Sequence, residues 1–240
     1  MSLKAILFDL DGTLLPMNQD EFIKSYFGLL SMKLVNYGYE PKKLIDSIWK
    51  GTMKMVANTG EKTNEKVFWE FFSEVYGEDV INDEPKFADF YFNEFQKVQN
   101  VCGFNKKSRE VIEYLKKENF ELILATNPIF PSIATNSRIK WAGLNKDDFK
   151  YITTYENSCY SKPNLKYYLE IFEKNNINPN ECLMVGNDVT EDMVIQKLGV
   201  KVFLLTDCLI NKNDEDINNY PHGSLDNLLD YINEIKNSEQ

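Results

Sequence analysis

The sequence lacks several features that would assign the protein to broad classes. No run of 18 apolar residues occurs in its 240 residues, so we predict no membrane-spanning helix and no membrane partner. Positive charge is in deficit, because 27 lysines and arginines face 37 aspartates and glutamates, for a formal net charge of −10. Nucleic-acid binding needs a basic surface, so we expect no nucleic-acid partner. A small anionic substrate remains compatible with this charge, since a local cation can override the overall field.

Cysteine and histidine are also scarce. The four cysteines form no CxxC pair, which favours reduced thiols in a cytoplasmic protein over a disulfide framework. The first residues lead directly into an apolar run, without the basic and apolar segments of a secretory signal, and this too favours the cytoplasm. The single histidine, His222, lies between Pro221 and Gly223 near the C-terminus, where we expect a loop residue without a catalytic role.

The sequence does contain short apolar runs that alternate with helical patterns. The runs are rich in Ile, Val, Leu and Phe, which is typical of strands buried on both faces. They cover residues 3–8, 121–125, 151–154, 182–185 and 200–205. Helical patterns cover residues 108–118, 132–143, 164–175 and 190–199. This alternation predicts an α/β fold, with a parallel sheet covered by helices on both faces.

Residues 18–100 interrupt the alternation with an all-helical stretch. Four segments there repeat apolar residues at intervals of three and four, and they contain no strand-like run. A connection of this length belongs in a compact domain only if it is itself a folded unit. We therefore predict a sheet core formed by residues 1–16 and 101–240, with an all-helical domain inserted at residues 17–100. We interpret the aromatic residues of the insertion as its core.

Polar side chains follow the apolar runs at their C-terminal ends. They are Asp9, Asp11, Thr126, Asn127, Lys162, Asp188, Glu191 and Asp192. Because ligands of an open parallel sheet bind beyond the carboxyl ends of the strands, we expect these side chains to converge at one edge. Each feature alone has an ordinary explanation, such as a turn, a solvated lysine or an acidic helix N-terminus. Their shared placement at strand ends favours a functional site.

The residue types in this set suit phosphoryl transfer. Several carboxylates at one place repel one another unless a cation is present, and Mg²⁺ commonly takes one or two carboxylates together with a substrate phosphate. The Thr126 hydroxyl and the Lys162 ammonium are donors suited to phosphoryl oxygens. One carboxylate can attack phosphorus, and a second one two residues later can protonate the leaving oxygen and then activate water. The sequence thus predicts a phospho-aspartate mechanism.

Four motifs carry a family resemblance: FDLDGTL at residues 8–14, LATN at 124–127, SKPN at 161–164 and VGNDVTED at 185–192. Together they resemble the motifs of the haloacid dehalogenase-like hydrolase superfamily. The resemblance spans nearly the whole chain. It implies a Rossmann-like core, a mobile helical cap of the first cap class, and Mg²⁺ as cofactor. Because Asp11 is present, it favours phosphatases or phosphomutases over the family's dehalogenases, which lack the second aspartate.

The resemblance also implies roles for single residues. Asp9 would be the nucleophile, Asp11 the general acid and base with its backbone carbonyl on the metal, and Lys162 a catalytic cation. The implied substrate-binding residues are Thr126, Asn127 and Lys162. The implied metal site consists of Asp9, Asp11, Asp188 and Asp192. Asn187 stands where the commoner fourth motif has an aspartate, so the choice of ligand between Asp188 and Asp192 stays open here.

We therefore predict a Mg²⁺-dependent phosphatase for a small phosphorylated metabolite, with a monomer slightly favoured. A phosphomutase or a phosphonatase on the same scaffold is an alternative, and the phosphonatase would need a cap lysine such as Lys50 or Lys54. A catalytically silent binding protein is a further alternative, against which the intact residue set speaks. We also predict hinges at residues 16–19 and 100–105, and a substrate contact from the cap loop at residues 57–63.

Overall fold

A computed structural model describes residues 2–238, and its centre is a parallel sheet. Six strands pair in the order β3-β2-β1-β4-β5-β6. They are β1 (Ala5–Phe8), β2 (Glu121–Leu124), β3 (Tyr151–Ile152), β4 (Cys182–Gly186), β5 (Lys201–Leu205) and β6 (His222–Gly223). β1 lies in the middle of the sheet and is bonded to β2 on one side and β4 on the other. The α/β fold with a parallel sheet is confirmed.

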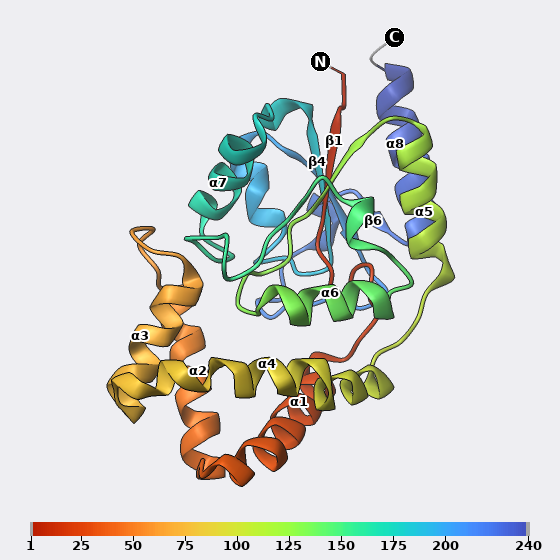
Figure 1. Cartoon of the computed structure of the whole chain (residues 1–240). Helices are drawn as coiled ribbons and strands as arrows, with labels where there is room; N and C mark the ends of the chain where they lie inside the picture. The colour runs from red at the N-terminus through yellow and green to blue at the C-terminus, as the bar shows by residue number, and fades with distance from the viewer. Residues whose placement is uncertain (1, 239–240) are drawn as a thin grey trace.

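Helices cover both faces of the sheet, as Figure 1 shows. They are α5 (Lys106–Lys117), α6 (Ser132–Trp141), α7 (Leu165–Asn175) and α8 (Leu225–Ser238). Successive residues of a strand point to opposite faces. Ile6 and Phe8 accordingly pack into the apolar cluster that contains residues of α5 and α8, whereas Ala5 and Leu7 pack into the cluster that contains residues of α7. β1 is thereby buried on both faces, which explains its continuous apolar sequence.

The helical segment between β1 and α5 lies beyond the carboxyl ends of the strands (Figure 1). It contains α1 (Gln19–Leu34), α2 (Pro41–Val56), α3 (Asn64–Tyr76), α4 (Glu84–Phe92) and the 3₁₀ helix η3 (Glu94–Val101). Its aromatic side chains pack edge to face in large numbers, for example Phe72 against Phe87 at 5.6 Å between ring centroids. Most of the aromatic residues therefore form a core for the segment, as expected from the sequence.

Two backbone stretches connect the helical segment to the sheet, and they run side by side. Met17 and Cys102 form an antiparallel bridge, and the Gly103 N–H donates to the Pro16 carbonyl at 2.7 Å. The predicted hinges at residues 16–19 and 100–105 are therefore paired with each other. This pairing gives the helical segment one double-stranded attachment to the core.

Three parts of the secondary structure differ from the sequence-based expectation. Residues 190–199 form only a 3₁₀ helix, η6 (Met193–Leu198), because the preceding loop extends to Asp192 and Gly199 ends the helix at a φ of 81°. β6 and α8 were not predicted. His222 lies in β6, exposed, with its Nδ1 2.9 Å from the Tyr220 carbonyl. Within residues 2–238, no helix has the length and apolarity needed to cross a membrane.

Candidate active site

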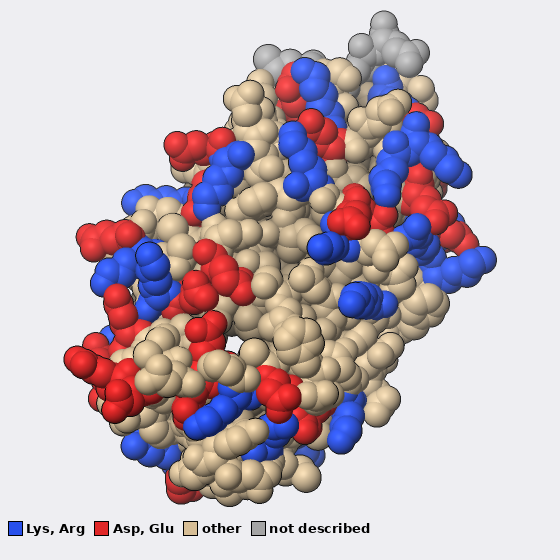
Figure 2. Space-filling view, viewed as in Figure 1, with Lys and Arg blue, Asp and Glu red and all other residues tan. Residues whose placement is uncertain are grey.

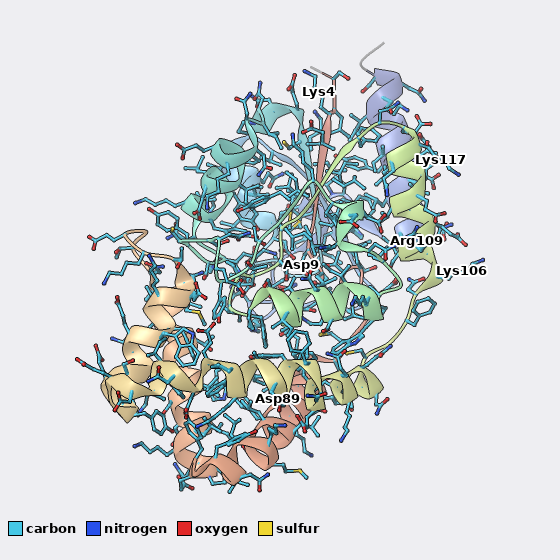
Figure 3. The ribbon with its side chains drawn as sticks, in the orientation of Figure 1. Lys4, Asp9, Asp89, Lys106, Arg109 and Lys117 are labelled. Carbon is cyan, nitrogen blue, oxygen red and sulfur yellow. The ribbon has the colours of Figure 1, made fainter. Side chains whose placement is uncertain are left out.

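The predicted site residues lie together at the carboxyl end of the sheet. Figure 3 shows Asp9 at the end of β1 nearest the helical segment, with Lys4 at the opposite end. A cavity of about 460 Å³ opens between this edge and the helical segment. All eight polar residues singled out in the sequence line it: Asp9, Asp11, Thr126, Asn127, Lys162, Asp188, Glu191 and Asp192. The expectation that strand ends bring them together is met by the geometry.

Lys162 connects two carboxylates at the base of the cavity. Its Nζ lies 2.9 Å from Asp9 Oδ1 and 2.6 Å from Asp192 Oδ1, and its side chain is only 1 % exposed. Burial raises the pKa of Asp192 to about 7. Burial also disfavours the charged lysine, but the carboxylates of Asp192 and Asp9 outweigh it and hold the pKa of Lys162 well above its usual value. Lys162 therefore stays charged, because two carboxylates face one ammonium group.

The turn after β1 orients the second oxygen of Asp9. The Thr13 hydroxyl lies 3.2 Å from Asp9 Oδ2 and 3.0 Å from Asn187 Oδ1, so it can donate to either acceptor. Asn187 is itself fixed by a 2.7 Å hydrogen bond from its Nδ2 to the Cys208 carbonyl. Gly12 adopts a φ of 85°, and a Cβ there would come within 2.3 Å of Asn187 Nδ2. The glycine of the first motif is therefore required both by its conformation and by space.

Asp11 is paired with a residue that the sequence analysis did not single out. Arg138 of α6 is buried, donates from Nη1 to Asp11 Oδ2, and lies over the Phe130 ring. Burial raises the pKa of Asp11 to about 6, and the positive charge of Arg138 counteracts part of that rise. The other oxygen, Asp11 Oδ1, is buried without a hydrogen-bond partner among the described residues. Asp11 is thus held by one oxygen and has an unused acceptor on the other.

The loop after β4 is organised by its own carboxylates. Asp188 Oδ1 accepts from the backbone N–H groups of Thr190 and Glu191, at 2.8 and 2.9 Å. Asp192 Oδ2 accepts from the Asp188 N–H at 3.0 Å, so hydrogen bonds occupy both Asp192 oxygens. Asn127 donates to Glu191 at 3.0 Å, and burial raises the pKa of Glu191. Thr126 is buried beside them in the cavity lining.

The donor set can be tested for its fit to a divalent cation. In residues 2–238, no three His, Cys, Asp or Glu side chains are grouped closely enough to form a metal site. Mg²⁺ does not need three, since it commonly uses one or two carboxylates, with water and substrate oxygens completing the shell. Asp9, Asp188 and the carbonyl of Asp11 have oxygen atoms of this kind in or beside the cavity lining, so the residues present fit such a cation. The surplus of carboxylates over cations in the cavity lining also suits a cation there.

The comparisons with known proteins give a family for the chain. The sequence pattern described as haloacid dehalogenase-like hydrolase matches residues 6–205. The chain belongs to the haloacid dehalogenase-like hydrolase family. It is accordingly a hydrolase, and its α/β fold is the one seen in structures of this family. No match was found among curated proteins.

Solved structures with the same fold cover nearly the whole chain. A phosphatase of this family from Thermococcus onnurineus is 19% identical, with a TM-score of 0.59 over 96% of this chain and 98% of its own. A putative hydrolase of the family from Bacillus subtilis, described as bound to magnesium, is 19% identical, with a TM-score of 0.56 over 97% and 100%. A putative β-phosphoglucomutase from Thermotoga maritima is 17% identical, with a TM-score of 0.56 over 97% and 99%.

Two expectations about the helical segment of this hydrolase need correction. The loop at residues 57–63 does not line the cavity; it contacts the core instead, where Gly60 lies against the Tyr160 side chain. Lys50 and Lys54 do not line the cavity either, and Lys54 Nζ lies 6.0 Å from the centre of the Phe71 ring. The α2 residues that do line the cavity are Ile48, Trp49, Thr52, Met53, Met55 and Val56. Neither lysine is placed to act as the cap lysine of a phosphonatase.

Proposed function

We propose that this hydrolase is a Mg²⁺-dependent phosphatase that cleaves a small phosphate monoester through a phospho-aspartate on Asp9. The observation that carries the proposal is the Asp9 carboxylate, held by the buried Lys162 at the base of a cavity of about 460 Å³. In this proposal residues 17–100 act as the cap, and residues 1–16 and 101–240 form the core. The substrate enters from the side that the cap covers, and its phosphorus atom comes within reach of the Asp9 carboxylate.

The proposed chemistry uses two steps. Asp9 attacks phosphorus, forming an oxygen–phosphorus bond while the bond to the leaving oxygen breaks, and protonated Asp11 gives its proton to that oxygen. Asp11 then takes a proton from water, the resulting hydroxide attacks the phospho-aspartate, and inorganic phosphate leaves with Asp9 restored. A pKa near 6 allows Asp11 to exchange its proton close to neutral pH. The charge of Lys162 offsets the repulsion between carboxylate and phosphate.

Mg²⁺, when bound, would further neutralise the phosphoryl oxygens, with Asp9, Asp188 and the Asp11 carbonyl as its protein ligands. The similar structure from Bacillus subtilis is described as bound to magnesium, which supports Mg²⁺ as the cation but does not bear on the choice of ligands. For Asp192 we propose a positioning role, because its two oxygens are occupied by Lys162 and the Asp188 N–H. We propose that the Thr126 hydroxyl donates a hydrogen bond to the phosphoryl group. Asn127 lines the same subsite, and its side-chain amide donates to Glu191.

A phosphomutase uses the same first step, so the fold does not discriminate against it. It must bind a phosphorylated sugar as acceptor, which needs hydrogen-bonding groups on the cap side of the cavity. Of the cap residues that line the cavity, only Gln19 and Thr52 have polar, non-aromatic side chains. The phosphatase is therefore favoured. A silent binding protein would not need the ion pair between Lys162 and Asp9. Burying such a pair costs desolvation free energy, which argues that the pair has a function.

The test is hydrolysis of p-nitrophenyl phosphate by the purified protein with and without Mg²⁺. We expect turnover that depends on Mg²⁺ and that Asp9→Asn abolishes, because an amide is a poor nucleophile and a weaker ligand. Asp230→Asn, on the exposed side of α8, is the matched control and should keep normal turnover. Turnover by Asp9→Asn within tenfold of the wild-type rate, or none by the wild type with Mg²⁺, would refute the proposal.

A further inference from the structure

The cap side of the cavity carries no charged side chain among the described residues. Its lining comes from α1, α2, α3 and α4, and consists of aromatic and aliphatic residues apart from Gln19 and Thr52. The hydroxyls of Tyr26 and Tyr91 lie 3.0 Å apart, so one donates to the other within the wall. The wall opposite the catalytic carboxylates therefore offers an apolar surface to whatever the phosphate group carries.

Cations in the cavity lining are confined to the core side. They are Lys162, which is already paired with Asp9 and Asp192, and Lys212, an exposed lysine in the acidic loop at residues 211–219. A carboxylate or a second phosphate on the organic group would face an uncharged wall and lose hydration without gaining a partner. A polyhydroxy group would find only isolated donors and acceptors on this wall, which are the side chains of Gln19 and Thr52, the tyrosine hydroxyls and the indole N–H groups of Trp49 and Trp69.

The rim of the cavity exposes large apolar side chains. Trp49 is 43% exposed and Met53 59% exposed, although both belong to the cavity lining on α2. The Phe27 ring lies 5.5 Å from the Trp49 ring at an interplanar angle of 40°. These two rings form a tilted pair at the open side, and an apolar ligand would remove part of their surface from water.

From these observations, and resting on the function proposed above, we propose that the organic group of the substrate is uncharged and predominantly apolar. Trp49 and Phe27 are the residues that select it. The volume of about 460 Å³ is within the range of pockets that enclose small-molecule ligands, and it leaves room for a group of the size of a benzene ring beyond the phosphate.

The experiment compares primary alkyl phosphates that share the same leaving-group chemistry. They are 2-phenylethyl phosphate, hexyl phosphate, glycerol 1-phosphate and 2-phosphoglycolate, each with Mg²⁺. We expect kcat/KM for 2-phenylethyl and hexyl phosphate to exceed that for the glycerol and glycolate esters by about tenfold or more, the effect of burying one large apolar group. Most of the difference should appear in KM.

A matched pair of variants assigns the preference to the rim. Trp49→Ala should lower kcat/KM for 2-phenylethyl phosphate by about tenfold and change that for glycerol 1-phosphate by less than about twofold. Phe92→Ala is the control, because Phe92 is an aromatic residue of α4 that is 69% exposed and does not line the cavity. It should leave all four substrates unchanged.

A binding measurement separates this inference from the proposed function. Titration calorimetry with Mg²⁺ would compare 3-phenylpropylphosphonate and 2-carboxyethylphosphonate, which the enzyme cannot hydrolyse as esters. Ester hydrolysis with equal or reversed preference would overturn the apolar selectivity and leave the phosphatase standing. Tighter binding of the phenyl compound, dependent on Trp49 and without hydrolysis of any ester, would support the selectivity and refute the phosphatase. Absence of both would refute both.

Discussion

At the scale of single residues, the arrangement around Asp11 shows how the chain separates the two aspartates of one motif. Asp9 is paired with Lys162, whereas Asp11 is paired with Arg138. The guanidinium of Arg138 is further fixed by contacts with Thr135 Oγ1 and the Phe130 ring. Arg138 therefore fixes one Asp11 oxygen, while Oδ1 has no partner among the described residues and is free for the proton transfer that we propose. We interpret Arg138 as a positioning residue.

This interpretation predicts that variants of Asp11 and Arg138 lose more activity with alkyl phosphates than with aryl phosphates. Asp11→Asn should lose about 10²–10⁴-fold in kcat with an alkyl phosphate, whose alkoxide needs a proton. The loss in the first step should be smaller with p-nitrophenyl phosphate, whose phenolate leaves without help. Arg138→Gln should show the same difference between alkyl and aryl substrates, with smaller losses, because the carboxyl group remains but is no longer oriented. Rapid-quench kinetics and mass spectrometry of the Asp9 peptide measure both steps.

A conservative substitution provides the control for that pair. Arg138→Lys keeps the charge and should recover part of the alkyl phosphate activity lost in Arg138→Gln. With Asp11→Asn, phospho-Asp9 should accumulate from p-nitrophenyl phosphate, because the second step still needs a base. Equal losses with alkyl and aryl substrates in Arg138→Gln would show that Arg138 acts only on stability.

The difference between Asp11 and Arg138 also shows what the sequence could predict of the site. Asp9, Asp11, Lys162 and Asp188 follow strands, and parallel strands bring their carboxyl ends together whatever the detailed packing. Arg138 lies on a helix, 127 positions from its partner, and local patterns do not specify that pairing. One signal was present: Arg138 is one of only two arginines in the chain and lies in a helical pattern beside apolar residues.

At the scale of secondary structure, most elements of the core have a sequence pattern that predicts them. The longer apolar strands and the helices α5, α6 and α7 were located to within a few residues, whereas α8 was missed. β6 has two residues and no apolar run, so only its pairing with β5 defines it. α8 was predictable, because Leu225, Leu228, Ile232 and Ile235 recur at helical spacing and are all buried. Before η6, Asp188 Oδ1 accepts from the N–H groups of Thr190 and Glu191, and sequence spacing does not reveal these loop hydrogen bonds.

The buried carboxylate of Asp148 connects α5 to the 3₁₀ helix η4 (Lys146–Asp148) before β3. This connection predicts how stability depends on pH. Burial alone would raise the pKa of Asp148, but hydrogen bonds from Lys116 and the Asn145 N–H, with the charge of Arg109, outweigh it and lower the pKa. A lowered folded-state pKa gives stability that is complete above the unfolded value, about 3.9, and is lost as pH falls through the folded value.

We therefore expect Asp148→Asn to reduce the free energy of unfolding by about 1–3 kcal/mol at pH 7. The difference from wild type should shrink as the pH falls below about 4, because the wild-type carboxylate then becomes protonated as well. Denaturant unfolding between pH 3 and pH 7 measures it. The neighbouring Asp147, which is exposed, provides the control variant Asp147→Asn. A difference that stays constant over this pH range would contradict the ion-pair explanation.

At the scale of the whole molecule, the core and the helical segment share one apolar cluster. Residues of β1, α5 and α8 belong to the same cluster as Phe22 and Tyr26 of α1. On the surface shown in Figure 2, basic and acidic side chains are interspersed over both parts. The segment is thus attached by its apolar contacts and by the paired linkers around Pro16 and Gly103. Any opening of the cavity must break further contacts between the two parts.

Asn64, at the start of α3, connects the helical segment to the core through several hydrogen bonds. It is fully buried, and its Nδ2 lies 3.0 Å from both the Pro128 carbonyl and Ser161 Oγ. Its Oδ1 accepts from Asn58 at 2.9 Å, and its backbone N–H donates to the Ser158 carbonyl at 2.8 Å. Ser161 directly precedes Lys162, so this contact joins the helical segment to the loop that carries Lys162. We interpret these hydrogen bonds of Asn64, called the latch below, as the contact that keeps the helical segment closed over the cavity.

Asn64→Ala should therefore make opening easier, because it leaves buried partners unsatisfied at a cost of about 1–3 kcal/mol. Hydrogen exchange at residues 16–19, 64–65 and 100–105 should speed up roughly tenfold, since opening needs both the latch and the paired linkers to separate. In the wild type, a phosphate analogue bound with Mg²⁺ should slow exchange at the same residues.

Asn93→Ala is the control, because Asn93 is exposed and its side chain bonds only to Asp89. If exchange at the linkers were the same in Asn64→Ala as in wild type, with or without the analogue, the linkers would not be hinges and the helical segment would not move as a unit.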